Sequence, residues 1–248
     1  THSTNVGLES AFFGGRLQVG LEYYYKKTTD AFMEKDISDI NGYTSYVVNS
    51  GTLTNKGFNV SLSATPVKVG DFYWILSGNV SKVWNKVETT PAGDSYELED
   101  FKNGTAVVDG YPVGTFWSYK FIGLNPIDGG PVFEDWEDRA AEVNNQDNYY
   151  AYTHMLVPTG KREPDVTGSI NNTFTYKEWR LGFSLVYNFG ARTRLFRIFD
   201  GYVNGFSAED NFNRDFISRW RKPGDEQHTN IPALMSTFSN EYFDYASH

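Results

Sequence analysis

Hydrophobic and polar residues alternate along this chain with a period of two. In the segment RLQVGLEYYYKK (residues 16–27), apolar or aromatic side chains occupy every second position, at Leu17, Val19, Leu21, Tyr23 and Tyr25. Because successive side chains of a strand point to opposite faces, this alternation predicts a strand with one apolar and one polar face. The same pattern predicts five further strands, over residues 5–13, 58–65, 72–84, 166–176 and 179–189.

The connections between these segments differ greatly in length. Very short turns are predicted at Gly14-Gly15, from Pro66 to Asp71 and at Lys177-Glu178. Long loops are predicted over residues 29–51, over residues 88–164 and from Ala191 onward. A tilted strand of roughly ten residues is long enough to cross a bilayer, and short turns on one side with long loops on the other are typical of an outer-membrane barrel.

Aromatic residues gather near both ends of the predicted strands, as they do in the interfacial girdles of membrane barrels. The polar faces are rich in Ser, Thr, Asn and Gln, which suit a wet lumen. We therefore predict an all-β protein, a portion of an antiparallel transmembrane β-barrel with about six strands and long extracellular loops. Six strands do not close such a barrel, so the remaining strands are expected elsewhere. The alternative is a soluble β-sandwich that binds carbohydrate, with its apolar face against a core.

Composition narrows the function classes. The 248 residues carry a net charge of −9 and no basic footprint, which argues against nucleic acid as a partner. The absence of cysteine excludes disulfides, thiolate metal sites and cysteine nucleophiles. No apolar stretch approaches 18 residues, and no enzyme motif is present, so we predict no catalytic residue, metal site or cofactor. The acidic group Glu134, Asp135, Glu137 and Asp138 lacks the spacing of a calcium loop and is interpreted as solvated loop charge.

Two groups of loop residues are candidate binding sites. In the loop over residues 88–164, aromatic rings lie near Asn and Asp, a combination that holds sugars and peptides by stacking and hydrogen bonding; the candidates are Trp117, Tyr119, Tyr149, Tyr150 and Tyr152. The alternative is that these rings pack the loop onto itself.

A second candidate lies after Ser207, which is placed to cap a short amphipathic helix. Phe212, Phe216, Ile217 and Trp220 would share one face of this helix, and Pro223-Gly224 would end it. We expect the helix either to brace a barrel rim or to contact a partner, through Phe216, Trp220, Pro223 and Gly224.

Several of these segments together resemble a known family. The stretches NVGLESAFFGGRLQVGLEYYYKKTTDAF, NSGTLTNKGFNVSLSATPVKVGDFYWILSGNVSKVWNKV and RWRKPGDEQHTNIPAL are similar to the C-terminal barrel half of the SusC/RagA family of TonB-dependent outer-membrane transporters. YPVGTFWSYKFIGLNPIDGGPVF and VTGSINNTFTYKEWRLGFSLVY are similar to the same family, in the same order along the chain. Trp84 departs from the pattern, which usually has a polar residue there.

The resemblance implies a location in the outer membrane of a Gram-negative cell, as part of a large plugged barrel. Residues 1–248 would be a partial receptor barrel domain, with the plug, the TonB box and further strands outside this chain. The implied function is import of oligosaccharides or peptides, without enzymatic activity. The implied partners are a SusD-like surface lipoprotein, the TonB complex through the plug, the other strands of the barrel, the lipid bilayer and the substrate.

Overall fold

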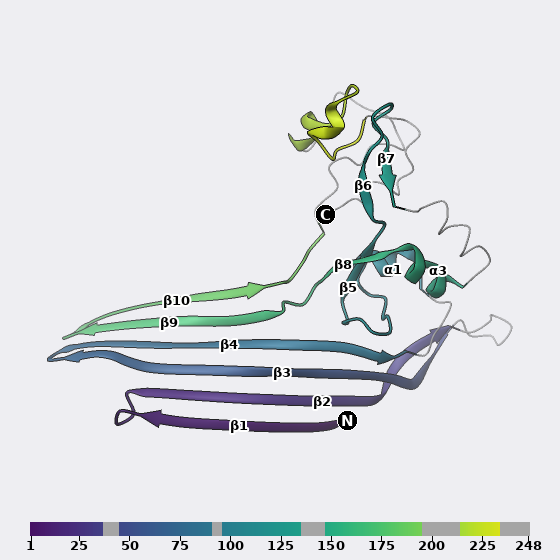
Figure 1. Cartoon of the computed structure of the whole chain (residues 1–248). Coiled ribbons are helices and arrows are strands. Elements are labelled where there is room, and N and C mark those ends of the chain that lie inside the picture. Colours follow the sequence, from purple (N-terminus) through teal and green to yellow (C-terminus); the bar gives the residue numbers. More distant parts are fainter. Residues whose placement is uncertain (37–44, 91–95, 135–146, 195–213, 234–248) are drawn as a thin grey trace. The chain divides into compact units, whose positions relative to one another are not determined.

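The computed structural model describes residues 1–36, 45–90, 96–134, 147–194 and 214–233 (Figure 1). The chain divides into two compact units. The first, which we call the sheet unit, comprises Thr1–Gly93, Gly104–Thr115 and Gly160–Arg192. The second, the loop unit, comprises Asp94–Asn103, Phe116–Thr159 and Thr193–His248. Within the described ranges, no helix has both the length and the apolar character needed to span a membrane.

The sheet unit is built on one antiparallel sheet of six strands, which confirms the predicted strands and fold class. The order across the sheet is β1 (His2–Phe12), β2 (Leu17–Asp36), β3 (Ser45–Val69), β4 (Phe72–Thr89), β9 (Val166–Tyr176) and β10 (Trp179–Phe189) (Figure 1). All neighbouring pairs are antiparallel, and the shorter strands β1, β9 and β10 are paired along their whole length. Among the described residues, β1 and β10 are the two edges of this sheet.

Two of the predicted connections are shorter than the sequence pattern indicated. The prediction of a long loop over residues 29–51 is wrong, because β2 and β3 stay paired as far as Asp36 and Ser45. Alternation fails near Thr28 because the pairing contains bulges there, and Asp30 adopts a positive φ of 56°. The turn predicted from Pro66 to Asp71 is only Gly70-Asp71, because Pro66 lies within β3.

The bulge at Pro66 keeps the apolar side chains of β3 in phase. The pairing of β3 with β4 shifts between Ala64 and Val67, so that Thr65 and Pro66 together lie opposite the single residue Ile75 and β3 gains one residue. Proline has no N–H to donate to a ladder, and a bulge is one of the few places in a sheet that tolerates it. Without the shift, Val67 and Val69 would point to the face opposite Leu62, because side chains alternate strictly along a strand.

The register places most of the apolar side chains of the six strands on one face, which we call the apolar face. Leu8 lies opposite Leu21, Leu21 opposite Val60, and Val60 opposite Val80. A second row across the sheet reads Val19, Leu62, Gly78, Ile170 and Leu185. Leu8, Leu181 and Leu185 remain 60%, 65% and 59% exposed. The described residues therefore leave this face uncovered.

The opposite face, which we call the polar face, is joined by side-chain hydrogen bonds. The amide of Asn59 donates to Glu22 at 2.9 Å, and the hydroxyl of Ser81 donates to Asn59 at 2.6 Å, which links β2, β3 and β4. Ser169 donates to Asn79 at 2.6 Å and links β9 to β4. These short polar side chains satisfy one another across neighbouring strands, in agreement with the predicted polar lining.

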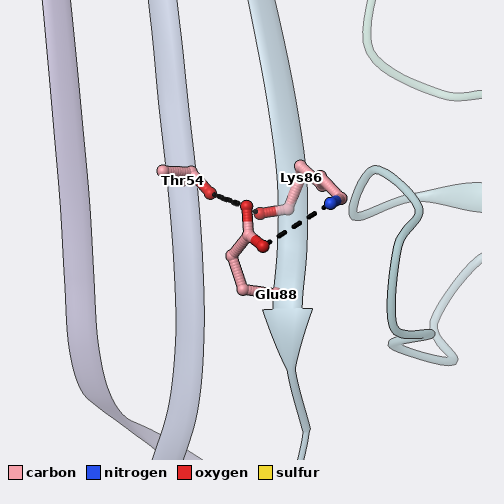
Figure 2. Close-up of polar contacts among 3 residues, drawn as sticks. All are labelled: Thr54, Lys86 and Glu88. Atoms are coloured by element: carbon pink, nitrogen blue, oxygen red, sulfur yellow. Dashed lines mark hydrogen bonds and ion pairs between the residues drawn. The ribbon is translucent and has the colours of Figure 1, made fainter.

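Charged residues replace the apolar ones at the end of the sheet far from the short turns. Beyond Trp84, the side chains of Lys86 and Glu88 form an ion pair at 3.5 Å, and Thr54 donates to Glu88 at 2.6 Å (Figure 2). The hydrogen bond from Thr54 lowers the pKa of the Glu88 carboxyl, and Lys86 acts in the same direction. The apolar face thus has a defined boundary along the strands.

Two tyrosines lie across glycines of the neighbouring strand. Tyr24 lies over Gly57, and Tyr187 lies over Gly168, its direct partner in the pairing of β10 with β9. The hydroxyl of Tyr187 passes Gly168 and donates to the backbone oxygen of Asn79 on β4 at 3.3 Å. A Cβ at position 168 would lie 2.3 Å from both the Asn79 oxygen and the Tyr187 hydroxyl. Glycine is therefore required where the ring crosses.

We predict that Gly168→Ala destabilises the sheet by about 1–3 kcal/mol, because the added methyl group must displace backbone or ring atoms. Gly182→Ala is the matched control, since its Cβ would meet no atom closer than 3.7 Å. Thermal unfolding of the full-length protein in detergent measures the difference. Equal midpoints for the two variants would contradict the crossing of Tyr187 over Gly168.

Candidate functional site

The loop unit contains an aromatic core formed by three segments distant in sequence. Its elements are α1 (Leu98–Asn103), β5 (Thr115–Ser118), α3 (Asn148–Met155) and β8 (Val157–Lys161), with β5 paired to β8. Phe101 of α1 is fully buried, and its ring centroid lies 6.2 Å from Trp117 and 5.3 Å from Tyr152. Tyr96 joins Tyr149 to the same group at 6.2 Å. The rings thus pack the loop onto itself.

This packing leaves the five candidate binding rings with very different exposure to solvent. Trp117 and Tyr119 are only 2% and 7% exposed, so neither offers a face to a ligand in this fold. Tyr149 and Tyr152 point into the aromatic core and are half-buried. Burial raises the pKa of the Tyr152 hydroxyl, and the charge of Glu97 adds to the rise. Only Tyr150, which is 42% exposed, presents its ring to solvent.

Tyr150 is held in place by contacts within α3. Asp147 caps the start of this helix, and its carboxylate accepts a hydrogen bond from the Tyr150 backbone N–H at 2.6 Å. The ring of His154 stacks on that of Tyr150, with centroids 3.8 Å apart and planes inclined by 25°. His154 Nδ1 lies 2.8 Å from the backbone oxygen of Tyr150. Sequence reasoning selected Tyr150 but missed His154, whose i+4 spacing on a helix was the available signal.

Arg194 links two parts of the aromatic core and was also missed. Its guanidinium donates to the backbone oxygen of Lys102 at the end of α1 at 2.5 Å, and to the backbone oxygen of Trp117 at 2.6 Å. It also donates to the Ser118 hydroxyl at 3.0 Å and lies 5.7 Å from the centre of the Phe116 ring. One side chain therefore bonds backbone carbonyl groups of two segments that are distant in sequence. Nothing in the local sequence around Arg194 marks this role.

A second, smaller core surrounds Trp220. The hairpin of β6 (Phe121–Leu124) and β7 (Pro131–Phe133) contributes Leu124, which clusters with Trp220 and Ala233. Trp220 is 8% exposed, and its backbone N–H donates to the oxygen of Ile231 at 2.8 Å. Gly129 lies against the indole so closely that a Cβ would be 2.3 Å from a ring carbon. The hairpin and residues 214–233 are therefore packed together by one indole ring.

The amphipathic helix predicted after Ser207 is corrected in two respects. The described part is a short 3₁₀ helix, η2 (Arg214–Ser218), while Ser207 and Phe212 lie outside the described residues. Phe216 is 6% exposed but Ile217 is 66% exposed, so the two do not share a buried face. The prediction assumed the spacing of an α-helix, whereas three residues per turn place these side chains differently.

The predicted stop at Pro223-Gly224 is a tight turn held by two carboxylates. Gly224 has a φ of 101° and precedes η3 (Asp225–Gln227). Asp225 accepts from the backbone N–H groups of Arg221 and Lys222 at 3.0 and 3.1 Å. Glu226 accepts from the backbone N–H of Gly224 at 2.8 Å and from the indole of Trp220 at 3.1 Å. These acids therefore bind the loop's own backbone and indole.

Within the part of the chain that the structure describes, no three His, Asp or Glu side chains cluster as a metal site would require. Three members of the acidic group considered in the sequence, Asp135, Glu137 and Asp138, lie outside the described residues. The geometry of the loop unit consequently offers ring faces and hydrogen-bonding edges, at Tyr150 and His154, and exposed basic and apolar side chains near Pro223.

Comparison of the sequence with known proteins identifies TonB-dependent receptors. TonB-dependent receptor P26 of Formosa agariphila is 29% identical over 212 residues, which are 79% of this chain and 21% of that protein. TonB-dependent receptor SusC of Bacteroides thetaiotaomicron is 27% identical over 200 residues, 75% of this chain and 19% of that protein. The chain spans about a fifth of the length of the curated relatives it matches. No protein-family model matches it.

Comparison of the fold gives a consistent result. The structure of the RagAB peptide importer in its open-open state superposes with a TM-score of 0.72 and 20% identity, covering 94% of this chain and 25% of that chain. The closed-closed state gives a TM-score of 0.67 and 21% identity over the same shares. The resemblance to SusC/RagA transporters and the predicted fold class are thereby confirmed.

We predict that the turn at Pro223-Gly224 loosens in acid through Glu226. The hydrogen bond from its own backbone N–H lowers the pKa of Glu226 below 4.5, and those from Trp220 and Gly224 add to this. A lowered folded pKa means that the ionised carboxylate stabilises the turn above the unfolded pKa, and that this stabilisation is lost as pH falls through the folded pKa.

Hydrogen exchange of the Gly224 amide and of the Trp220 indole N–H, corrected for intrinsic exchange rates, measures this loosening between pH 7 and pH 3. Glu226→Gln is the control, because the amide does not titrate in this range and should remove the pH dependence. A wild-type profile that matches the Gln variant would show that Glu226 does not hold the turn.

Proposed function

We propose that this chain forms part of the wall and loops of a TonB-dependent importer in a Gram-negative outer membrane. The transporter would take up oligosaccharides or peptides together with a SusD-like surface lipoprotein. The observation that carries the proposal is the apolar face, which runs across six strands in register and is left uncovered by the described residues. Energy coupling through TonB would belong to a plug outside this chain.

The dimensions of the apolar face support a bilayer as its environment. Along β10 it extends from Trp179 to Phe189, ten steps of about 3.3 Å, or roughly 25 Å measured along the membrane normal at the usual strand tilt. That height equals the apolar band of outer-membrane barrels. The aromatic side chains at its two ends, Trp179 and Tyr176 on one side and Tyr25 and Trp84 on the other, suit the two interfaces.

The alternative of a soluble carbohydrate-binding sandwich lacks such support. A sandwich buries the apolar face of one sheet against a second sheet about 10 Å away. Leu8 on β1, Leu62 on β3 and Leu181 on β10 are 60%, 40% and 65% exposed. Contiguous exposure of this kind across a whole sheet marks a surface that contacts lipid or protein. Recovery of the full-length protein as a soluble monomer without detergent would nevertheless favour the sandwich.

Substitutions on the two faces of β2 test the proposed membrane environment. Leu21 lies near the middle of the apolar face, whereas Gln18 lies on the polar face. Leu21→Arg should destabilise the assembled barrel by about 2–4 kcal/mol, because a charge near the bilayer midplane is poorly solvated. Gln18→Arg should be tolerated. Urea titration of the full-length protein in lipid vesicles measures both.

Cysteine labelling provides an independent measurement of the same faces. A water-soluble maleimide should modify Cys introduced at position 18 faster than Cys introduced at position 21. The opposite order would reject the proposed face assignment even if both variants fold.

The loop around Pro223-Gly224 is the proposed contact for the lipoprotein partner. Of the four predicted rim residues, Phe216 and Trp220 are buried and hold the segment, while Pro223 and Gly224 are exposed. Arg221 and Lys222 are exposed beside them, and the neighbouring acids Asp225 and Glu226 bind backbone and indole groups instead. The loop thus presents positive charge next to exposed Ile217, a combination that suits an acidic protein surface with an apolar pocket.

We predict that the double substitution Arg221→Glu and Lys222→Glu weakens association with the lipoprotein encoded beside the transporter. The loss should be largest at low salt and shrink at high salt, because exposed charges are screened. Co-purification of the two proteins in detergent at both salt concentrations measures it. The control is Arg16→Glu with Lys177→Glu at the short turns, which should bind normally. Equal binding by both double variants would remove this loop from the interface.

A further inference from the structure

We infer that Tyr150 and His154 form a stacking platform for the ring of a neutral sugar, which makes an oligosaccharide the substrate class. The inference rests on the proposed import function and narrows it. It is carried by the stacked geometry of the two rings, whose centroids are 3.8 Å apart, and by the exposure of Tyr150. Among the described rings of α3, only these two project away from the aromatic core.

The platform is fixed before any ligand arrives. Tyr149 and Tyr152 of the same helix pack toward Tyr96 and Phe101, which orients α3 and turns its other side outward. Asp147 holds the backbone N–H of Tyr150, and the His154 ring is bonded to the backbone oxygen of Tyr150. A rigid ring loses little conformational entropy on binding, so less of the favourable contact free energy is offset by the cost of ordering the site.

The hydrogen bond made by His154 Nδ1 also determines whether Nε2, on the outer edge of the ring, donates or accepts hydrogen bonds. A backbone oxygen only accepts, so Nδ1 must be the nitrogen that carries the proton in this contact. In the neutral ring, Nε2 then has a free lone pair and accepts hydrogen bonds. The Tyr150 hydroxyl both donates and accepts. The platform therefore combines flat ring faces with an acceptor and a hydroxyl at its edge.

This chemistry matches a sugar better than a peptide. The C–H face of a pyranose packs on an aromatic ring, and its hydroxyl groups can donate to Nε2 and exchange hydrogen bonds with the Tyr150 hydroxyl. Extended peptides are recognised mainly through their main-chain N–H and C=O groups. The backbone groups of Tyr150 are already bonded, the N–H to Asp147 and the oxygen to Thr153 and His154, so they are not offered to a peptide main chain. The Asp147 carboxylate is committed to the cap.

A role confined to helix stability is the competing explanation, because aromatic side chains four residues apart stabilise isolated helices. Tyr150→Leu separates the two roles, since leucine is a better helix former than tyrosine but has no ring face. Tyr150→Phe keeps the ring and removes only the hydroxyl. Tyr111→Leu, at another exposed tyrosine of the chain, is the control for loss of a surface ring.

The experiment uses the full-length transporter purified in detergent with its lipoprotein partner. It is incubated with a mixture of neutral oligosaccharides from partial hydrolysis of starch, xylan and mannan, and separately with a tryptic digest of casein. Retained molecules are quantified by mass spectrometry. We expect the wild type to retain oligosaccharides, Tyr150→Leu to retain about fivefold to tenfold less, and Tyr150→Phe and Tyr111→Leu to stay within about twofold of the wild type.

Three outcomes would overturn the inference. Equal oligosaccharide retention by Tyr150→Leu and the wild type would return the pair to a role in helix stability. Retention of casein peptides alone would identify a peptide importer and leave the proposed transport function standing. Retention of neither mixture by the wild type would contradict import of both classes, and so the proposed function together with the inference.

Discussion

The backbone register of the six-stranded sheet is the constraint on which the rest of the structure depends. Because side chains alternate strictly along a strand, a slip of one residue in any pair would move that strand's apolar set to the polar face. The observed pairing brings Leu21, Val60 and Val80 together and, two residues away on each strand, Val19, Leu62 and Gly78. Both surfaces of the sheet, and the environments proposed for them, follow from this one choice of register.

The register is maintained by local features at which the simple alternation breaks down. The bulge at Thr65 and Pro66 changes the phase of β3 so that Val67 rejoins the apolar face opposite Trp74. Gly168 gives Tyr187 room to cross β9 and bond to the backbone of β4. The Tyr187 ring covers the backbone that Gly168, which has no side chain, leaves exposed. The same ring links β10, β9 and β4 at one point. These irregular positions restrict slippage more than uniform alternation could.

Elements that depend on local sequence could be predicted, whereas elements that depend on contacts between distant residues could not. Strands such as Trp179–Phe189 were predicted because period-two alternation is a local property of eleven consecutive residues. The continuation of β2 to Asp36 was not, because its pairing depends on a bulge that interrupts the pattern. In the loop unit, Trp117 is buried by contacts with residues as far away as Arg194, 77 positions along the chain. Aromatic composition alone does not distinguish a ring that packs inward from one that binds a ligand.

The loop unit shows how long connections become ordered around small sheets of two strands each, β5 with β8 and β6 with β7. Its segments have few ladder partners, so backbone carbonyl groups must find other donors. Arg194 serves Lys102 and Trp117 in this way, and Asp225 and Glu226 serve the N–H groups of the turn at Pro223-Gly224. Phe101 and Trp220 supply the two apolar centres. Once these contacts fix the backbone, the rings left outside them are held rigidly at the surface. Tyr150 owes its fixed exposure to the packing of Tyr149 and Tyr152 on the same helix, so the aromatic core and the proposed binding surface are products of the same contacts.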